Sequence, residues 1–190
     1  MSEDVETWRR RGDAARLAHE AVNAAFRQHV REREPDRYAA LLKDFWEKTA
    51  AALPSSDRAF MPALASGHVR FVDRAIAFLE ADPWFFRSGY EKQNLIRHLK
   101  RAQLTEAQRM RLARVVLAAI DGHAGGVPGH AGGVRENGHR VEFRHFGRLA
   151  CGVWSDFLDA EVARRMQSPD PGIRRRATWV AEAAISAGRA

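Results

Sequence analysis

Apolar residues recur at intervals of three and four along almost the whole chain, the spacing that places side chains on one face of an α-helix. No segment shows the sustained alternation of apolar and polar residues, enriched in β-branched types, that is typical of a half-buried strand. The pattern therefore predicts an all-α fold of about seven to eight helices.

Four helices are predicted in the first half of the chain. They cover residues 3–33, with Gly12 as a point where the helix can restart, then 35–53, 57–64 and 66–82. The residues expected on their buried faces are Ala15, Ala18, Val22, Ala25, Phe26 and Val30 in the first helix, Tyr38, Leu41, Leu42, Phe45 and Trp46 in the second, and Val72, Ala75, Ile76 and Leu79 in the fourth.

The second half predicts four more helices, over 89–101, 105–121, 141–166 and 172–186. Thr105 and Gln108 have the spacing of a capping box, which would open the second of these. The buried positions expected here are Met110, Ala113, Leu117 and Ile120, followed by Phe146, Leu149, Val153, Trp154, Phe157, Val162 and Met166. The aromatic stretch WFFRS at 84–88 and the five tryptophans are expected to pack into the core.

The segment SPDPGIRRRATWVAEAAI at 168–185 combines an Asp-Pro turn, an arginine run and small apolar residues, and SGHVRFVDRAIAFLEADP at 66–83 echoes it, with Arg74-Ala75 in the place of Arg176-Ala177. This pattern resembles the second helix of HEAT-like repeats. The resemblance implies helix pairs that stack into an irregular α-solenoid with an extended binding surface. No clean repeat of about 40 residues is present, so a compact multi-helix bundle is the alternative.

Composition narrows the class of protein. A chain of 190 residues with 45% hydrophobic and 29% charged residues suits one folded domain over 1–190. Cys151 is the only cysteine, which excludes an internal disulfide and a multi-cysteine zinc site. The amino terminus has no apolar signal region and no apolar run approaches 18 residues, so we expect a cytoplasmic location and no membrane partner.

The formal charge of +7 is concentrated in the middle of the chain, and the stretch 87–114 is strongly basic. Helical spacing places Arg97, Lys100 and Arg101 on one face, and Arg111 and Arg114 on one face of the next helix. If both faces lie together, they form a positive patch for nucleic-acid phosphates or for an acidic protein surface. The alternative is a solvated polar face.

The stretch GHAGGVPGHAGGV at 122–134 repeats GHAGGV around Pro128. Its glycines leave the backbone too free to hold His123, His130 and His139 as metal ligands, and it lacks the strand and Gly-Lys-Ser/Thr ending of a phosphate-binding loop. We therefore interpret 122–140 as a flexible Gly/His-rich loop. Whether it orders on binding is open.

Two Glu-x-x-His pairs, Glu136/His139 and Glu142/His145, lack the partner carboxylates of a di-iron site. Cys151 lies among apolar neighbours, which favours packing over nucleophilic catalysis. In the run Arg174-Arg175-Arg176, one arginine is expected to pair with an acid of a neighbouring helix.

The leading hypothesis is a non-catalytic helical-repeat adaptor, or small subunit of a larger complex, that binds a protein partner and needs no cofactor. The alternative is a nucleic-acid-binding protein that uses the basic patch at 87–114. A less favoured hypothesis is a DNA glycosylase, because some of these enzymes are built of HEAT-like repeats, although none of their site residues can be matched here. The identity of the partner and the oligomeric state are open.

Overall fold

A computed structural model describes residues 4–122 and 136–189 of the chain, and these residues form ten α-helices and one short 3-10 helix. The all-α prediction is confirmed. The chain divides into two compact units, Met1–Lys92 and Gln93–Ala190, which are described separately below. The expectation of a single domain stays a prediction.

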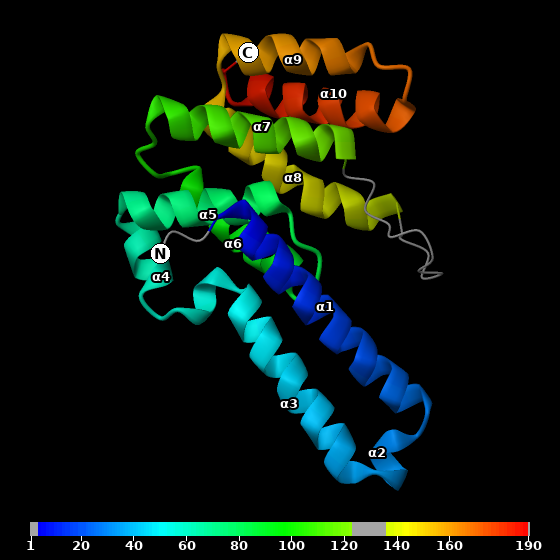
Figure 1. Cartoon of the computed structure of the whole chain (residues 1–190). Coiled ribbons are helices and arrows are strands. Elements are labelled where there is room, and N and C mark those ends of the chain that lie inside the picture. Colours follow the sequence, from blue (N-terminus) through cyan, green and yellow to red (C-terminus); the bar gives the residue numbers. More distant parts are fainter. Residues whose placement is uncertain (1–3, 123–135, 190) are drawn as a thin grey trace. The chain divides into compact units, whose positions relative to one another are not determined.

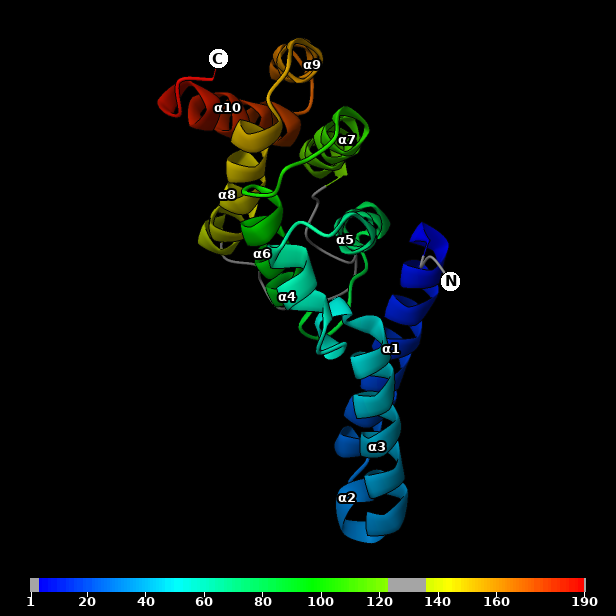
Figure 2. The same cartoon turned by 90° about the vertical axis from the view of Figure 1, so that its left-hand side faces the viewer.

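Unit 1 is built around a helical hairpin. Helix α1 (Val5–Arg27) and helix α3 (Pro35–Ala52) lie side by side, and the short helix α2 (Val30–Arg33) joins them at the far end (Figures 1 and 2). The predicted single helix over 3–33 is wrong at its end, because His29 adopts a left-handed conformation with φ of 56° that breaks the helix before α2.

The core of the hairpin joins Ala18 and Val22 of α1 to Phe45 of α3, and Tyr38, Leu41 and Leu42 are only partly buried against it. Phe26 was predicted to be buried but is 58% exposed. Val22 and Ala25 are the buried residues in this part of α1.

The rest of unit 1 consists of the 3-10 helix η1 (Pro54–Ser56), α4 (Phe60–Ala65), α5 (Val69–Ala81) and the start of α6 (Ser88–Leu99). The predicted buried face of α5, Val72, Ala75, Ile76 and Leu79, is confirmed. Trp8 of α1 packs edge-on against Phe78 of α5, with ring centroids 5.4 Å apart. Gly12 does not interrupt α1, and instead lets the helix approach Pro83, whose Cβ would lie 2.6 Å from an added side-chain carbon.

The tryptophans and the WFFRS stretch follow the core prediction only in part. Trp8 and Phe85 are buried, whereas Trp46, Trp84 and Phe86 are exposed. The prediction is therefore wrong for three large aromatic side chains of unit 1, because the described residues provide no element that covers them.

Unit 2 contains the end of α6 and four longer helices, α7 (Glu106–Gly122), α8 (Glu136–Val153), α9 (Asp156–Met166) and α10 (Pro171–Ser186). Helix α7 packs on α8, α9 packs on α10, and α8 also packs on α10 (Figure 1). The capping box before α7 is confirmed, since the amide of Thr105 donates to Gln108 Oε1 at 3.0 Å and the amide of Gln108 donates to Thr105 Oγ1 at 3.3 Å.

The predicted helix over 141–166 is two helices, which together with α2 raises the number in the described ranges above the expected seven to eight. Helix α8 ends at Val153, and Ser155 caps α9 by accepting a hydrogen bond from the amide of Leu158. A serine hydroxyl accepts hydrogen bonds from the free amides at the start of a helix, so Ser155 favours the start of a new helix over the continuation of α8. Helix α8 also begins at Glu136, so the predicted loop over 122–140 is shorter at its end, and residues 123–135 lie outside the described ones.

Candidate functional site

The five cationic residues singled out in the sequence lie at two places in unit 2. Arg97 and Lys100 stand in and just after the last turn of α6, followed by Arg101, while Arg111 and Arg114 belong to α7. Arg97, Arg101 and Arg114 are exposed, and Lys100 and Arg111 are half-buried. The structure brings the first group against a helix that the sequence interpretation did not consider, namely α8.

Close backbone contact joins the end of α6 to α8. A Cβ atom added at Gly152 of α8 would lie 3.4 Å from the carbonyl oxygen of Lys100 and 3.5 Å from its Cα. These distances are those of ordinary van der Waals contact, so the backbone at Lys100 lies directly against α8 at Gly152. The cations of α6 are thereby placed beside those of α8.

His145 follows Arg144 directly on α8 and is only 8% exposed. Burial is the main cause that lowers the pKa of His145, and the positive charges of Arg144, Arg148, Arg97 and Lys100 lower it further. We call Arg97, Lys100, Arg144 and Arg148 the cationic surface.

Among the side chains that the structure describes, in residues 4–122 and 143–189, no carboxylate forms an ion pair with the cationic surface. Arg164 and Arg165 form ion pairs in this part of unit 2, and none of the four cations of the surface takes part in one there. The sequence RHFGR at 144–148 could have indicated half of this surface, because residues four apart share a helix face. The approach of α6 to α8 could not be predicted from it.

The formal charge is divided unequally between the two units. Unit 2 holds 16 of the 31 Lys and Arg residues but only 9 of the 24 Asp and Glu residues, so it carries the whole +7. Unit 1 holds 15 of each and is formally neutral. The net charge of unit 2 therefore favours anionic ligands, whereas that of unit 1 favours neither sign.

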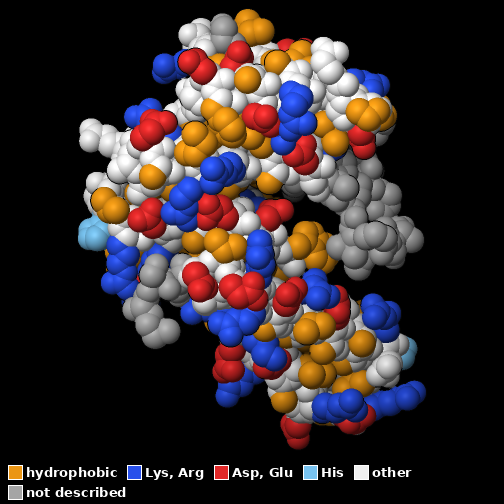
Figure 3. Space-filling model, turned by 45° about the horizontal axis from the view of Figure 1, so that its top comes forward, with side chains coloured by type: hydrophobic (Ala, Val, Ile, Leu, Met, Phe, Trp, Pro, Cys, Tyr) orange, Lys and Arg blue, Asp and Glu red, His pale blue; other side chains and the backbone are white. Residues whose placement is uncertain are grey.

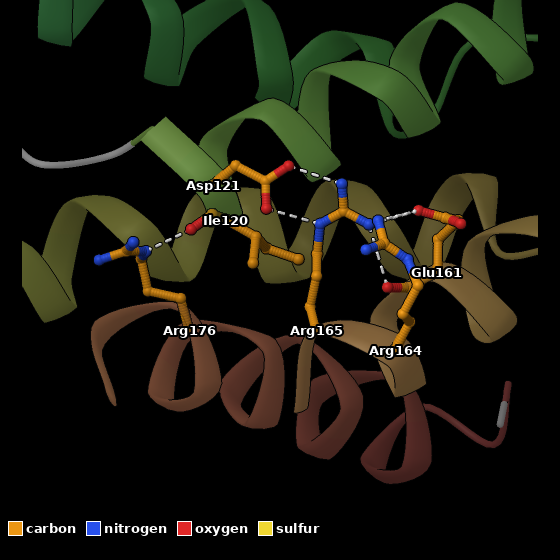
Figure 4. A network of polar contacts seen from close by, with 6 residues as sticks. All are labelled: Ile120, Asp121, Glu161, Arg164, Arg165 and Arg176. Atoms are coloured by element: carbon orange, nitrogen blue, oxygen red, sulfur yellow. Dashed lines mark hydrogen bonds and ion pairs between the residues drawn. The ribbon is translucent and has the colours of Figure 1, made fainter. Parts of the chain in front are cut away.

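A second group of charged residues in unit 2 is a structural network (Figure 4). Arg165 of α9 is buried and donates to both carboxylate oxygens of Asp121 at the end of α7, at 2.7 and 2.6 Å, and also to Glu161. Glu161 accepts from Arg164 as well, at 2.9 Å. Since each charge is matched within the network, these side chains fasten α7 to α9 and leave no free charge for a ligand.

The three consecutive arginines of α10, Arg174, Arg175 and Arg176, make three different contacts. Arg174 donates to the carbonyl oxygens of Ser168 and Pro169, at 2.6 and 2.9 Å. Arg175 stacks over the ring of Trp179, and Arg176 donates from Nε to the carbonyl oxygen of Ile120 at 2.7 Å (Figure 4). The expected ion pair with an acid of a neighbouring helix is replaced by a hydrogen bond to a backbone carbonyl at the end of α7.

Unit 1 carries a surface that the sequence did not reveal, formed by four aromatic rings from three segments. His19 stacks on Phe45 with centroids 5.1 Å apart, Phe45 contacts Trp46 at 4.7 Å, and Phe86 contacts all three rings at 5.5 to 6.2 Å. Trp46 is 51% exposed and Phe86 is 43% exposed. We call His19, Phe45, Trp46 and Phe86 the aromatic surface.

Ion pairs on the same turns flank the aromatic surface. Arg16 and Glu20 pair at 2.9 Å on α1, and Asp44 and Lys48 pair at 2.8 Å on α3. In the view of Figure 3, hydrophobic side chains gather over the hairpin and charged side chains lie at its edges. An apolar centre with a polar rim is the usual composition of a protein–protein interface.

The other candidate residues from the sequence are not brought together into a catalytic or metal-binding group in the part of the chain that the structure describes. Cys151 is half-buried, its Sγ donates to the carbonyl oxygens of Gly147 and Ala183, and burial raises its pKa. Helix α8 includes both Glu-x-x-His pairs, but the side chains of residues 136–142 lie outside the described ones, as do His123 and His130. Among the side chains that the structure describes, in residues 4–122 and 143–189, no three metal-ligating groups come together. No helix in the described part of the chain is long and apolar enough to span a bilayer.

No known protein family matches the chain, and neither the curated proteins nor the solved structures include a significant match. The geometry of the two surfaces is therefore the basis for the function.

Proposed function

We propose that the protein is a non-catalytic helical-repeat adaptor that docks a protein partner on the aromatic surface of unit 1. The observation that carries this proposal is the mutual contact of Trp46 and Phe86, two large rings that are both about half exposed. Tryptophan is among the residues that contribute most to binding energy in protein interfaces, where it lies at the centre of a desolvated patch.

The charge of unit 1 favours a protein over a nucleic acid at this surface. Unit 1 is formally neutral, and the charges beside the rings are already paired, as in Arg16–Glu20 and Asp44–Lys48. A nucleic acid needs unpaired cations beside the rings on which its bases stack. The matching partner is a protein segment that presents apolar side chains and brings no large net charge.

The helix order of unit 2 supports the helical-repeat part of the proposal. Two helix pairs, α7–α8 and α9–α10, pack on one another. Arg74 and Arg176, which carry the resemblance to HEAT-like repeats, each occupy the sixth position of their helix and reach an earlier element. Arg74 pairs with Asp57 at 3.3 Å, and Arg176 donates to Ile120.

The test compares a double variant of the aromatic surface, Trp46→Ser with Phe86→Ser, with the control Ile185→Ser. Ile185 is 63% exposed on α10 in unit 2. The control therefore removes an exposed apolar side chain that is not part of the aromatic surface. Proteins that copurify stoichiometrically with the wild-type chain in its native cells are identified, and each is then purified and titrated against the three forms.

We expect a single purified partner whose Kd rises about 30-fold or more with the double variant, the effect of losing about 2 kcal/mol at a hot spot. The control should change the Kd less than about twofold. A wild-type chain that copurifies with no protein, or a partner held equally by all three forms, would contradict the proposal.

A further inference from the structure

We propose that the cationic surface of unit 2 binds the phosphate backbone of double-stranded nucleic acid, and that His145 takes up a proton when it does. This proposal concerns a different unit and a different ligand from the docking of a protein on unit 1. Either can fail while the other stands.

The four cations are arranged as a binding surface. Arg144 and Arg148 are four residues apart on α8, and Arg97 and Lys100 are three residues apart at the end of α6, so each pair shares a face with about 5–6 Å between the side-chain roots. Lys100 lies against Gly152 of α8, which places the end of α6 beside that helix. Three of the four are arginines, whose planar guanidinium groups can each donate two parallel hydrogen bonds to a phosphate.

The energetic reason for a polyanion is the absence of internal neutralisation. Among the side chains described in residues 4–122 and 143–189, the four cations have no carboxylate partner, and their positive charges add to burial in lowering the pKa of His145. Like charges that are held together repel one another. A phosphate backbone relieves this repulsion and releases the counterions that it had condensed.

The distribution of exposed apolar side chains favours a duplex over a single strand. Single-stranded nucleic acid is held largely by stacking of its bases on exposed aromatic rings. In the described part of unit 2, the large hydrophobic residues that are exposed are Phe157 on α9 and Ile185 on α10. The exposed ring of α6 is Tyr90, which lies in the first turn of that helix and belongs to unit 1. Residues 93–101 and 143–153, which carry the four cations, therefore offer contacts to a backbone and no large exposed ring for a base.

His145 makes the binding sensitive to pH. Burial is the largest cause that lowers its pKa, and the charges of Arg144 and Arg148 on its own helix and of Arg97 and Lys100 at the end of α6 lower it further. Phosphates bound beside these cations offset their field, so the pKa of His145 is higher in the complex than in the free protein. The complex then binds a proton that the free protein does not, and affinity increases as the pH falls from neutral toward the pKa of the free imidazole.

The experiment measures binding of the full chain to labelled duplex DNA of mixed sequence by fluorescence anisotropy, at about 50 and about 200 mM salt. Duplex RNA, single-stranded DNA and polyglutamate are tested as competitors. The variant Arg97→Gln with Arg148→Gln removes two cations of the surface, and the control Arg31→Gln with Arg33→Gln removes two exposed cations of unit 1. Circular dichroism melting of each form verifies that it is folded.

We expect wild-type binding that weakens steeply with salt, and a double variant whose log Kd against log salt slope is smaller by about two, since each phosphate contact contributes about one. The control should keep the wild-type slope, and duplex should compete better than single strands or polyglutamate. Absence of binding at low salt, equal loss in both variants, or equal competition by polyglutamate would overturn the proposal, the last in favour of an acidic protein.

The proton uptake has its own test. His145→Gln should bind duplex as the wild type does at pH 7.5 but lose the gain in affinity at lower pH, whereas His98→Gln on α6 should keep it. The NMR titration of His145 in the wild-type chain should show a higher pKa with duplex bound. Binding that depends on pH equally in His145→Gln, or a pKa of His145 that duplex does not change, would overturn this part.

Discussion

Asp121 and Arg165 are joined by two hydrogen bonds, from Nε to Oδ1 at 2.7 Å and from Nη2 to Oδ2 at 2.6 Å, although 44 positions separate them in the chain. The pair links the last turn of α7 to α9, and Arg165 is buried while Asp121 remains partly exposed. It therefore fastens two helices of unit 2 that are not consecutive.

Replacing Asp121 with Asn should destabilise the protein, because the buried guanidinium of Arg165 loses a charged acceptor and keeps only Glu161. We expect the free energy of unfolding to fall by about 1–3 kcal/mol, the range for a hydrogen bond to a charged group. Urea denaturation measures this change. Glu182→Gln on the exposed side of α10 removes a carboxylate outside the network and should change the value by less than about 0.5 kcal/mol. Equal effects of the two substitutions would show that the pair does not stabilise the fold.

Glu161 predicts how stability responds to acid. Hydrogen bonds from Arg164 and Arg165 lower its pKa from 4.5 to about 2 in the folded protein. Since the folded-state pKa is the lower one, this contribution is fully present above about pH 4.5 and is lost as the pH falls through about 2. Urea midpoints measured from pH 5 to pH 2 should therefore decline less in Glu161→Gln than in the wild type. Parallel declines would contradict the assignment.

Gly12 and Gly122 predict opposite tolerance to alanine. An alanine Cβ at Gly12 would lie 2.6 Å from Pro83 Cβ, whereas nothing lies within 4 Å of one at Gly122. Gly12→Ala should destabilise the protein by about 1–3 kcal/mol, as overpacking does, which corresponds to a Tm lower by several degrees. Gly122→Ala should leave the Tm within about 2 °C. A Gly12→Ala chain that melts at the wild-type temperature would contradict the close approach of α1 to Pro83.

Asp170 caps α10 and can be tested by a rescue. Its Oδ1 accepts hydrogen bonds from the amides of Gly172 at 2.6 Å and Ile173 at 3.0 Å. Asp170→Ala should lower the free energy of unfolding by about 1 kcal/mol, and Asp170→Ser should recover most of that loss because serine is also a good cap. A serine variant no more stable than the alanine variant would argue against capping.

Local signals in the sequence predicted most of the fold. The spacing of Thr105 and Gln108 predicted the start of α7, and the period of Val72, Ala75, Ile76 and Leu79 predicted the buried face of α5, because both depend on neighbours within one helix. The break at Ser155 was missed because the spacing of three and four continues across it, from Val153 and Trp154 to Phe157.

The binding surfaces were harder to predict for a physical reason. The apolar stripe that contains Phe45 and Trp46 indicates that this face of α3 is buried against another surface. It does not indicate whether another segment of the same chain or a partner buries it. The charge pattern indicated Arg97 and Lys100. Arg144 and Arg148 join them through the contact of the end of α6 with α8, which is a tertiary contact that the spacing of residues within one helix does not predict. Helical periodicity indicates which face of a helix is apolar or charged, whereas tertiary packing determines which segment lies against that face.

The central claim is that the aromatic surface docks a protein, and site-specific photocrosslinking tests it most directly. A photoreactive phenylalanine derivative replaces Trp46 in one form of the chain and Ile185 in a control form, and both are irradiated in native cells. The account predicts one discrete protein adduct from position 46, lost when Phe86→Ser is added, and no adduct of that mass from position 185. No adduct at position 46, or the same adduct from both positions, would contradict it.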